Sequence, residues 1–263
     1  MPCMADHGEP AHYIVFHPEY KRLALSVRAT ALEDRQLDRC WNGRVWVDKP
    51  PGNEDPFVLG PSWAYSYCHA TQLRRGPRAD GGYVRKGSCI IFCSGDYGDE
   101  GALVVDTAFW VAEAHEWMPA GGPPSRYEPD VTTKTEIWRF HLRFGSQPGG
   151  HKGAYTYEAA LYPQSDGCYS QLPLGATGDR VCVPICELSV KLGDLVRRGF
   201  SSQKGPVLLG RAALNEILGQ VAQRTTTEIV GDIQPVGNAL AALRKRRSDG
   251  CRPSPCGETC ENG

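Results

Sequence analysis

The segment Lys86-Gly-Ser-Cys-Ile-Ile-Phe-Cys93, followed by Leu103-Val-Val-Asp-Thr-Ala-Phe-Trp-Val-Ala112, decides the fold. Both apolar runs are short, rich in β-branched and aromatic residues, and bounded by turn residues. These features are typical of strands that are buried on at least one face. The segment between them, Ser94 to Gly101, is acidic and rich in glycine. The sequence therefore predicts a central β-hairpin with a long acidic loop.

One charged residue lies inside the second predicted strand. Side chains alternate along a strand, so four apolar residues are expected to share one face with Thr107: Leu103, Val105, Phe109 and Val111. Asp106 falls on the opposite face. A carboxylate inside such a strand needs a partner or water. We therefore expect Asp106 to be either structurally ion-paired or part of a functional site.

Upstream of the hairpin, the sequence predicts strands at 13–16 and 44–48. The segment 19–39 carries two different signals. Leu23, Leu25 and Val27 alternate as in a strand, whereas 32–37 has the composition of a helix. We interpret this segment as a strand followed by a helix.

Downstream of the hairpin, the prolines and glycines of 119–125 favour a boundary or a mobile lid. Three further strands are then predicted, at 136–144, at 155–161 and at 181–186. In the first of them, apolar and basic residues alternate clearly. Pro184 places the last strand at an edge or an end.

The last third of the chain changes to helical periodicity. Helices are predicted at 187–198 and 206–224, and a third begins at Pro235. The order of strands followed by helices predicts an α+β domain over residues 1–247. Its mainly antiparallel, barrel-like sheet would span 11–186 and pack on helices from 187–247. The tail, 248–263, lacks apolar residues for a core and is predicted to be disordered.

Composition limits the possible classes of protein. The chain has 263 residues and a formal net charge of −1, which argues against nucleic-acid binding through bulk charge but allows local basic faces. We expect no membrane span and a cytoplasmic location, because the sequence shows neither a long apolar stretch nor a secretion signal. The eleven cysteines are therefore expected to be reduced. Cys182 and Cys186 are interpreted as core thiols, and the oligomeric state is left open.

The stretch Tyr83-Val-Arg-Lys-Gly-Ser-Cys-Ile-Ile-Phe-Cys-Ser-Gly95, followed by a strand that ends Phe-Trp-Val-Ala-Glu113, resembles the strand pair of small PUA-like barrels. It is also similar to domains associated with modified nucleotides in phage and bacterial DNA-modification systems. The resemblance extends at most from Trp63 to Trp117 and consists of glycine and apolar positions. It implies a PUA-like core with a pocket that recognises a base or nucleotide, and it assigns no catalytic residue.

Several residues outside the hairpin are candidates for a site. The predicted strand 136–144 places Arg139, His141 and Arg143 on one face, where they either bind phosphate or simply face solvent. His151 lies in a glycine-rich loop and is either a general acid or base or a surface residue. The aromatic candidates for substrate binding are Trp63, Tyr65, Tyr155 and Tyr157.

Metal and cofactor motifs are weak in this chain. Cys251, Cys256 and Cys260 are spaced loosely like zinc ligands, but a CxxC pair and a clear fourth ligand are missing. Walker, GxGxxG, GxSxG and HExxH motifs are absent from the sequence, so it identifies no cofactor.

Two functional hypotheses follow from these residues. The first is a nucleotide- or nucleic-acid-binding protein with a PUA-like core that acts in base modification. The second is an acid–base enzyme on a small or nucleotide substrate, in which Asp106, His141 and His151 carry the chemistry. For the second hypothesis we expect Asp106 to lie in a solvent-reachable cleft with at least one of Arg139, His141 and His151.

Overall fold

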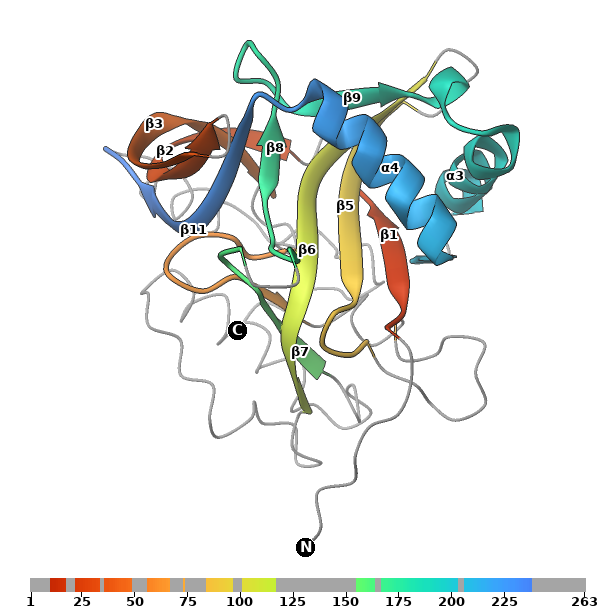
Figure 1. Cartoon of the computed structure of the whole chain (residues 1–263), viewed down its shortest axis with the longest axis horizontal. Helices are drawn as coiled ribbons and strands as arrows, with labels where there is room; N and C mark the ends of the chain where they lie inside the picture. Colours follow the sequence, from red (N-terminus) through yellow and green to blue (C-terminus); the bar gives the residue numbers. More distant parts are fainter. Residues whose placement is uncertain are drawn as a thin grey trace, which may run out of the picture.

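The structure is a computed structural model of the whole chain. It describes residues 10–17, 22–33, 36–48, 56–66, 73, 84–96, 101–116, 155–163, 167–202 and 206–237. Within these ranges the protein is a mixed α+β structure made mostly of strands, with two α-helices and one short 3-10 helix (Figure 1).

The larger sheet contains the predicted hairpin. Its strands follow the order β10-β1-β5-β6-β7-β4, and β9 pairs with β6 outside this path. These strands are β1 (His12–Phe16), β4 (Ala64–Ser66), β5 (Cys89–Asp96), β6 (Ala102–Glu116), β7 (Tyr155–Ala159), β9 (Val181–Pro184) and β10 (Val207–Leu209). The β1 and β5 pair is parallel and the other pairs are antiparallel. The predicted β5–β6 hairpin is therefore confirmed, and β7 and β9 match two further predicted strands.

The smaller sheet is antiparallel and curls into a half-barrel. Its order is β3-β2-β11-β8, and its strands are β2 (Arg22–Glu33), β3 (Gln36–Asp48), β8 (Leu172–Leu174) and β11 (Thr227–Pro235). Figure 1 shows β2 and β3 at the upper left and the helices at the upper right. The two sheets account for the predicted, mainly antiparallel α+β architecture at this coarse level.

Two apolar clusters bury the two faces of the larger sheet. On one face, side chains of β5 and β6 pack against α3 (Val190–Ser202) and α4 (Arg211–Arg224); this helix-side cluster includes Ile91, Val105, Val196 and Ile217. On the other face, β5 and β6 pack against the smaller sheet; this sheet-side cluster includes Phe92, Phe109, Val27 and Ile229. The hairpin therefore lies in the middle of a three-layer arrangement.

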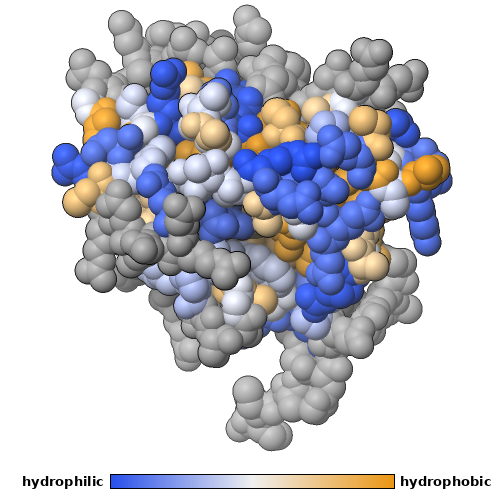
Figure 2. Space-filling model, turned by 45° about the horizontal axis from the view of Figure 1, so that its top comes forward, coloured by the Kyte–Doolittle hydropathy of each residue, from blue (hydrophilic) through white to orange (hydrophobic). Residues whose placement is uncertain are grey.

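The described residues on the face displayed in Figure 2 are mostly polar. Figure 2 shows hydrophilic residues interspersed with smaller apolar areas on the face that it displays. In the described part of the chain, no helix is long and apolar enough to cross a membrane.

Three secondary-structure predictions were wrong in whole or in part, and strand pairing explains each of them. Leu32 belongs to β2 and Leu37 to β3, and the two residues pair with each other instead of lying in one helix. The predicted helix over 206–224 begins only at Arg211 and follows the short strand β10. Pro235 ends strand β11, which pairs with both β2 and β8, instead of starting a helix.

Several other predictions concern residues that the structure does not describe. These are the boundary at 119–125, the strand at 136–144, and the tail at 248–263 with its three cysteines.

Candidate functional site

The β5–β6 hairpin contains a β-bulge at Asp106. Phe92 pairs with Thr107 and Cys93 pairs with Val105, so Asp106 is an extra residue with no opposite partner on β5. The extra residue also reverses the alternation of side chains along β6. Leu103 and Val105 accordingly pack on the helix side, whereas Phe109 and Val111 pack on the sheet side. The prediction that these four share one face was therefore wrong.

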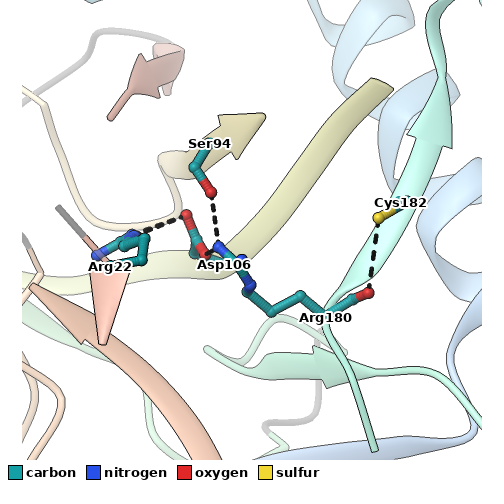
Figure 3. A network of polar contacts seen from close by, with 5 residues as sticks. All are labelled: Arg22, Ser94, Asp106, Arg180 and Cys182. Carbon is teal, nitrogen blue, oxygen red and sulfur yellow. Dashed lines mark hydrogen bonds and ion pairs between the residues drawn. The ribbon is translucent and has the colours of Figure 1, made fainter. Parts of the chain in front are cut away.

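Two arginines hold the Asp106 carboxylate. Arg22 donates to Oδ2 through Nη2 at 2.7 Å and through Nε at 3.1 Å. Arg180 donates through Nη1 to Oδ1 at 2.9 Å and to the Ser94 hydroxyl at 2.7 Å. Figure 3 shows Asp106 between the two guanidinium groups. The carboxylate thus has the charged partners that a buried acid requires.

The Asp106 cluster, defined as Arg22, Ser94, Asp106 and Arg180, joins the two sheets. Arg22 is the first residue of β2 in the smaller sheet, whereas Asp106 and Ser94 belong to the larger sheet. Arg180 lies where the chain passes from β8 to β9 and therefore from one sheet to the other; it forms a bridge with Leu174. The cluster fixes the crossing point between the two sheets.

Within the cluster, Asp106 is fully buried and Arg180 is slightly exposed to solvent. The Asp106 side chain has 0% of its area exposed and that of Arg22 has 3%, whereas that of Arg180 has 13%. The prediction that Asp106 lies in a solvent-reachable cleft is therefore wrong. Arg22 and Arg180 are the described ion-pair partners of Asp106, which confirms the need for a partner, whereas the expected Arg139 and His141 lie outside the described residues.

Arg180 also contacts a partly buried aromatic ring, Trp46, which packs against the sheet-side cluster. Its guanidinium carbon lies 5.1 Å from the centroid of the Trp46 ring, within the range of a cation–π interaction. Trp46 is partly exposed, and it flanks the buried Val45 on the outward-facing side of β3. Arg180 therefore contacts both the buried carboxylate and a partly exposed aromatic residue.

The outward face of the β2–β3 hairpin, called here the β2–β3 face, is polar and basic. Its members pair across the strands as Ala24 with Trp46, Ser26 with Arg44 and Arg28 with Asn42, and all of them are exposed except the partly buried Trp46. Ala24 and Ser26 are small, so the larger Trp46 and Arg44 side chains stand beside low neighbours. The face therefore presents two exposed arginines, of which Arg44 lies two residues from Trp46 along β3 and Arg28 lies farther along the hairpin.

The predicted aromatic site residues are core residues in this structure. Trp63, Tyr65 and Tyr157 each have 0% exposure. The Trp63 indole donates to the Gly231 carbonyl at 2.8 Å, and Tyr65 packs edge-to-face against Phe92 with ring centroids 4.9 Å apart. In this conformation none of the three rings presents a face to a base, so their predicted stacking role gains no support.

Four of the remaining predicted site residues lie outside the described part of the chain, and the fifth is described only in its backbone. Tyr155 is the first residue of β7, and only its backbone is described. Arg139, His141, Arg143 and His151 lie outside the described residues, so their predicted place beside Asp106 stays a prediction.

The described buried thiols are unsuited to nucleophilic catalysis. Burial, and secondly the charge of Asp106, raises the pKa of Cys93 well above its usual value; burial also raises the pKa of Cys89. Such thiols stay protonated, and the thiolate is the nucleophile. Cys182 and Cys186 are exposed, which corrects their interpretation as core thiols. The reduced state of the eleven cysteines stays a prediction.

Sequence reasoning missed Arg22, Arg180 and Trp46. The sequence offers little signal for them, because Arg22 is 84 positions and Arg180 is 74 positions away from Asp106.

Among the described residues, no group of three or more histidine, cysteine or acidic side chains could hold a metal ion. Comparison of the chain with protein-family models, with curated proteins and with solved structures gave no match.

Proposed function

We propose that this protein binds a nucleotide or a nucleic acid at the β2–β3 face, beside the Asp106 cluster. The observation that carries the proposal is the stacking of Arg180 on Trp46 next to the exposed Arg44. Guanidinium groups offer forked donors that suit phosphate oxygens, and aromatic rings stack on bases. An aromatic ring beside cations therefore suits a nucleotide, because the ring can stack on the base and the cations can bind the phosphate.

The buried carboxylate contributes by holding Arg180 in place. Asp106 and Ser94 each accept a hydrogen bond from Nη1 of Arg180, which fixes the guanidinium over Trp46. A side chain that is already ordered loses less conformational entropy when a ligand binds. In this proposal Asp106 is a positioning residue and does not touch the ligand.

The PUA-like identity and a role in base modification remain predictions that rest on the sequence resemblance. The acid–base alternative finds no support at Asp106, because that carboxylate is sealed and held by two arginines. His141 and His151 remain sequence-based candidates for that alternative.

Binding can be measured by fluorescence anisotropy with a labelled nucleotide and with labelled DNA and RNA oligonucleotides. We expect at least one of these ligands to bind, and we expect Arg44→Gln to weaken that binding. Arg198→Gln is the matched control, because Arg198 is an exposed arginine on α3, in the helical layer rather than in the smaller sheet. Loss of affinity in Arg44→Gln but not in Arg198→Gln supports the site. If no nucleotide, DNA or RNA binds, the proposed function is wrong.

A further inference from the structure

The basic groups of the β2–β3 face extend beyond the reach of one stacked nucleotide. Trp46, Arg44 and Asn42 occupy alternate positions of β3, and Arg28 stands opposite Asn42 on β2. The distance from Trp46 to Asn42 along the strand is about 13 Å, since each strand residue advances roughly 3.3 Å. A base on Trp46 thus leaves Arg28 available for another part of a longer ligand.

Charge is distributed unevenly across this face. Arg28 and Arg44 are exposed and Arg180 contacts Trp46 at one end. On the other side of β2, Gln234 of β11 pairs with Arg28, and both carboxylate oxygens of Asp232 accept from the Gln234 amide at 2.7 Å. The positive charge therefore follows the β2–β3 hairpin and is bounded by an acidic residue on β11.

We infer that the ligand of the β2–β3 face is a single-stranded nucleic acid that lies along the hairpin, with a base against Trp46 and phosphates at Arg44 and Arg28. This inference rests on the proposed function and makes its ligand specific. A polyanion complements a row of guanidinium groups. A duplex keeps its bases stacked, so their faces cannot reach an aromatic ring, whereas unpaired bases are free to stack.

The first test compares ligand length and strandedness for the full chain. Labelled single strands of about 4 to 16 nucleotides, which is the usual range of site sizes, are titrated beside a mononucleotide and the matching duplex. We expect the affinity to rise with strand length until the hairpin is covered, and the duplex to bind more weakly than its separate strands. A mononucleotide that binds as tightly as the longest strand, or a duplex that binds more tightly, overturns the inference and leaves the proposed function standing. If none of these ligands binds, both fail.

The second test identifies the contacts. Trp46→Ala should weaken single-strand binding by roughly 5- to 150-fold, equivalent to about 1–3 kcal/mol for loss of one stacked base. Arg28→Gln and Arg44→Gln should each reduce the slope of log affinity against log salt concentration by about 0.7, as expected for one phosphate contact to a single strand. Arg198→Gln should leave the slope unchanged.

The arginine variants keep the test decisive if Trp46→Ala does not fold, because Arg28 and Arg44 are exposed. Unchanged salt slopes in both Arg28→Gln and Arg44→Gln, together with an intact single-strand affinity, would place the ligand elsewhere and reject the inference.

Discussion

The two faces of the β5–β6 hairpin are held to their neighbours in different ways. The helix-side cluster consists of apolar side chains and the Cys89 and Cys93 thiols, contributed by strands and by both helices. The interface with the smaller sheet combines an aromatic-rich apolar cluster with the Asp106 cluster at its margin. An apolar interface gains stability in proportion to the area buried, whereas a buried ion cluster depends on all its members being present. The sheet-side interface should therefore be the more sensitive to the loss of a single charged side chain of the Asp106 cluster.

The largest effect is expected at the ion cluster. Asp106→Ala leaves the buried guanidinium of Arg22 and that of Arg180 without this carboxylate, and should lower the free energy of unfolding by about 3–5 kcal/mol. Urea denaturation of the variant and the parent measures the difference. A loss below about 1 kcal/mol would mean that water or another acid replaces Asp106, and the contrast between the two faces would then fail.

A substitution on the helix side sharpens the comparison. Ile217 of α4 is fully buried in the helix-side cluster, so Ile217→Ala should cost about 2–5 kcal/mol through lost burial and a cavity. Ile217→Val should cost only about 0.5–1.5 kcal/mol. This graded loss, measured by the same denaturation, is what an apolar interface predicts. Equal losses in the two variants would contradict it.

Acid should weaken the protein through a buried histidine on β1. Burial, and then the positive charge of Arg211, lowers the pKa of His12 from 6.5 to about 4. Its Nδ1 accepts the backbone N–H of Cys89 at 3.0 Å, which requires that nitrogen to be unprotonated. The unfolded chain takes up the proton first as the pH falls. The contribution of His12 is thus complete above pH 6.5 and is lost as the pH falls towards 4.

The urea midpoint of the parent protein should consequently fall between pH 7 and pH 4.5 by more than that of His12→Asn. Asparagine keeps an acceptor for the Cys89 N–H but does not titrate. Parallel pH profiles for the two proteins would show that other groups cause the whole acid dependence.

The smallest effect is expected at an exposed ion pair. Arg197 and Asp194 on α3 lie 3.4 Å apart and their side chains are 37% and 55% exposed. Asp194→Ala should therefore change the free energy of unfolding by less than about 1 kcal/mol. The substitution removes the same type of side chain as Asp106→Ala, so the pair of variants isolates the effect of burial. A similar loss in both would show that burial is not the cause.

Local patterns in the sequence determined several elements of this protein. The β5–β6 hairpin follows from two short apolar runs, the end of β9 from Pro184, and helix α4 from apolar residues such as Leu214, Ile217 and Val221 at helical spacing. The need for a partner at Asp106 also followed from the sequence alone. These features depend on residues that are near one another in the chain.

Tertiary structure decided the rest. Pairing of Leu32 with Leu37 overrode the helical composition of that segment, and β11 formed because it pairs with β2 and β8, which are far away in the sequence. The bulge at Asp106 reversed the faces of β6, and no periodicity rule anticipates one extra residue. Arg22 and Arg180 meet Asp106 only because two sheets cross there, with Arg180 at the passage from β8 to β9. The candidate site is therefore a product of long-range packing, which determines the neighbours of a side chain and cannot be derived from its position in the chain.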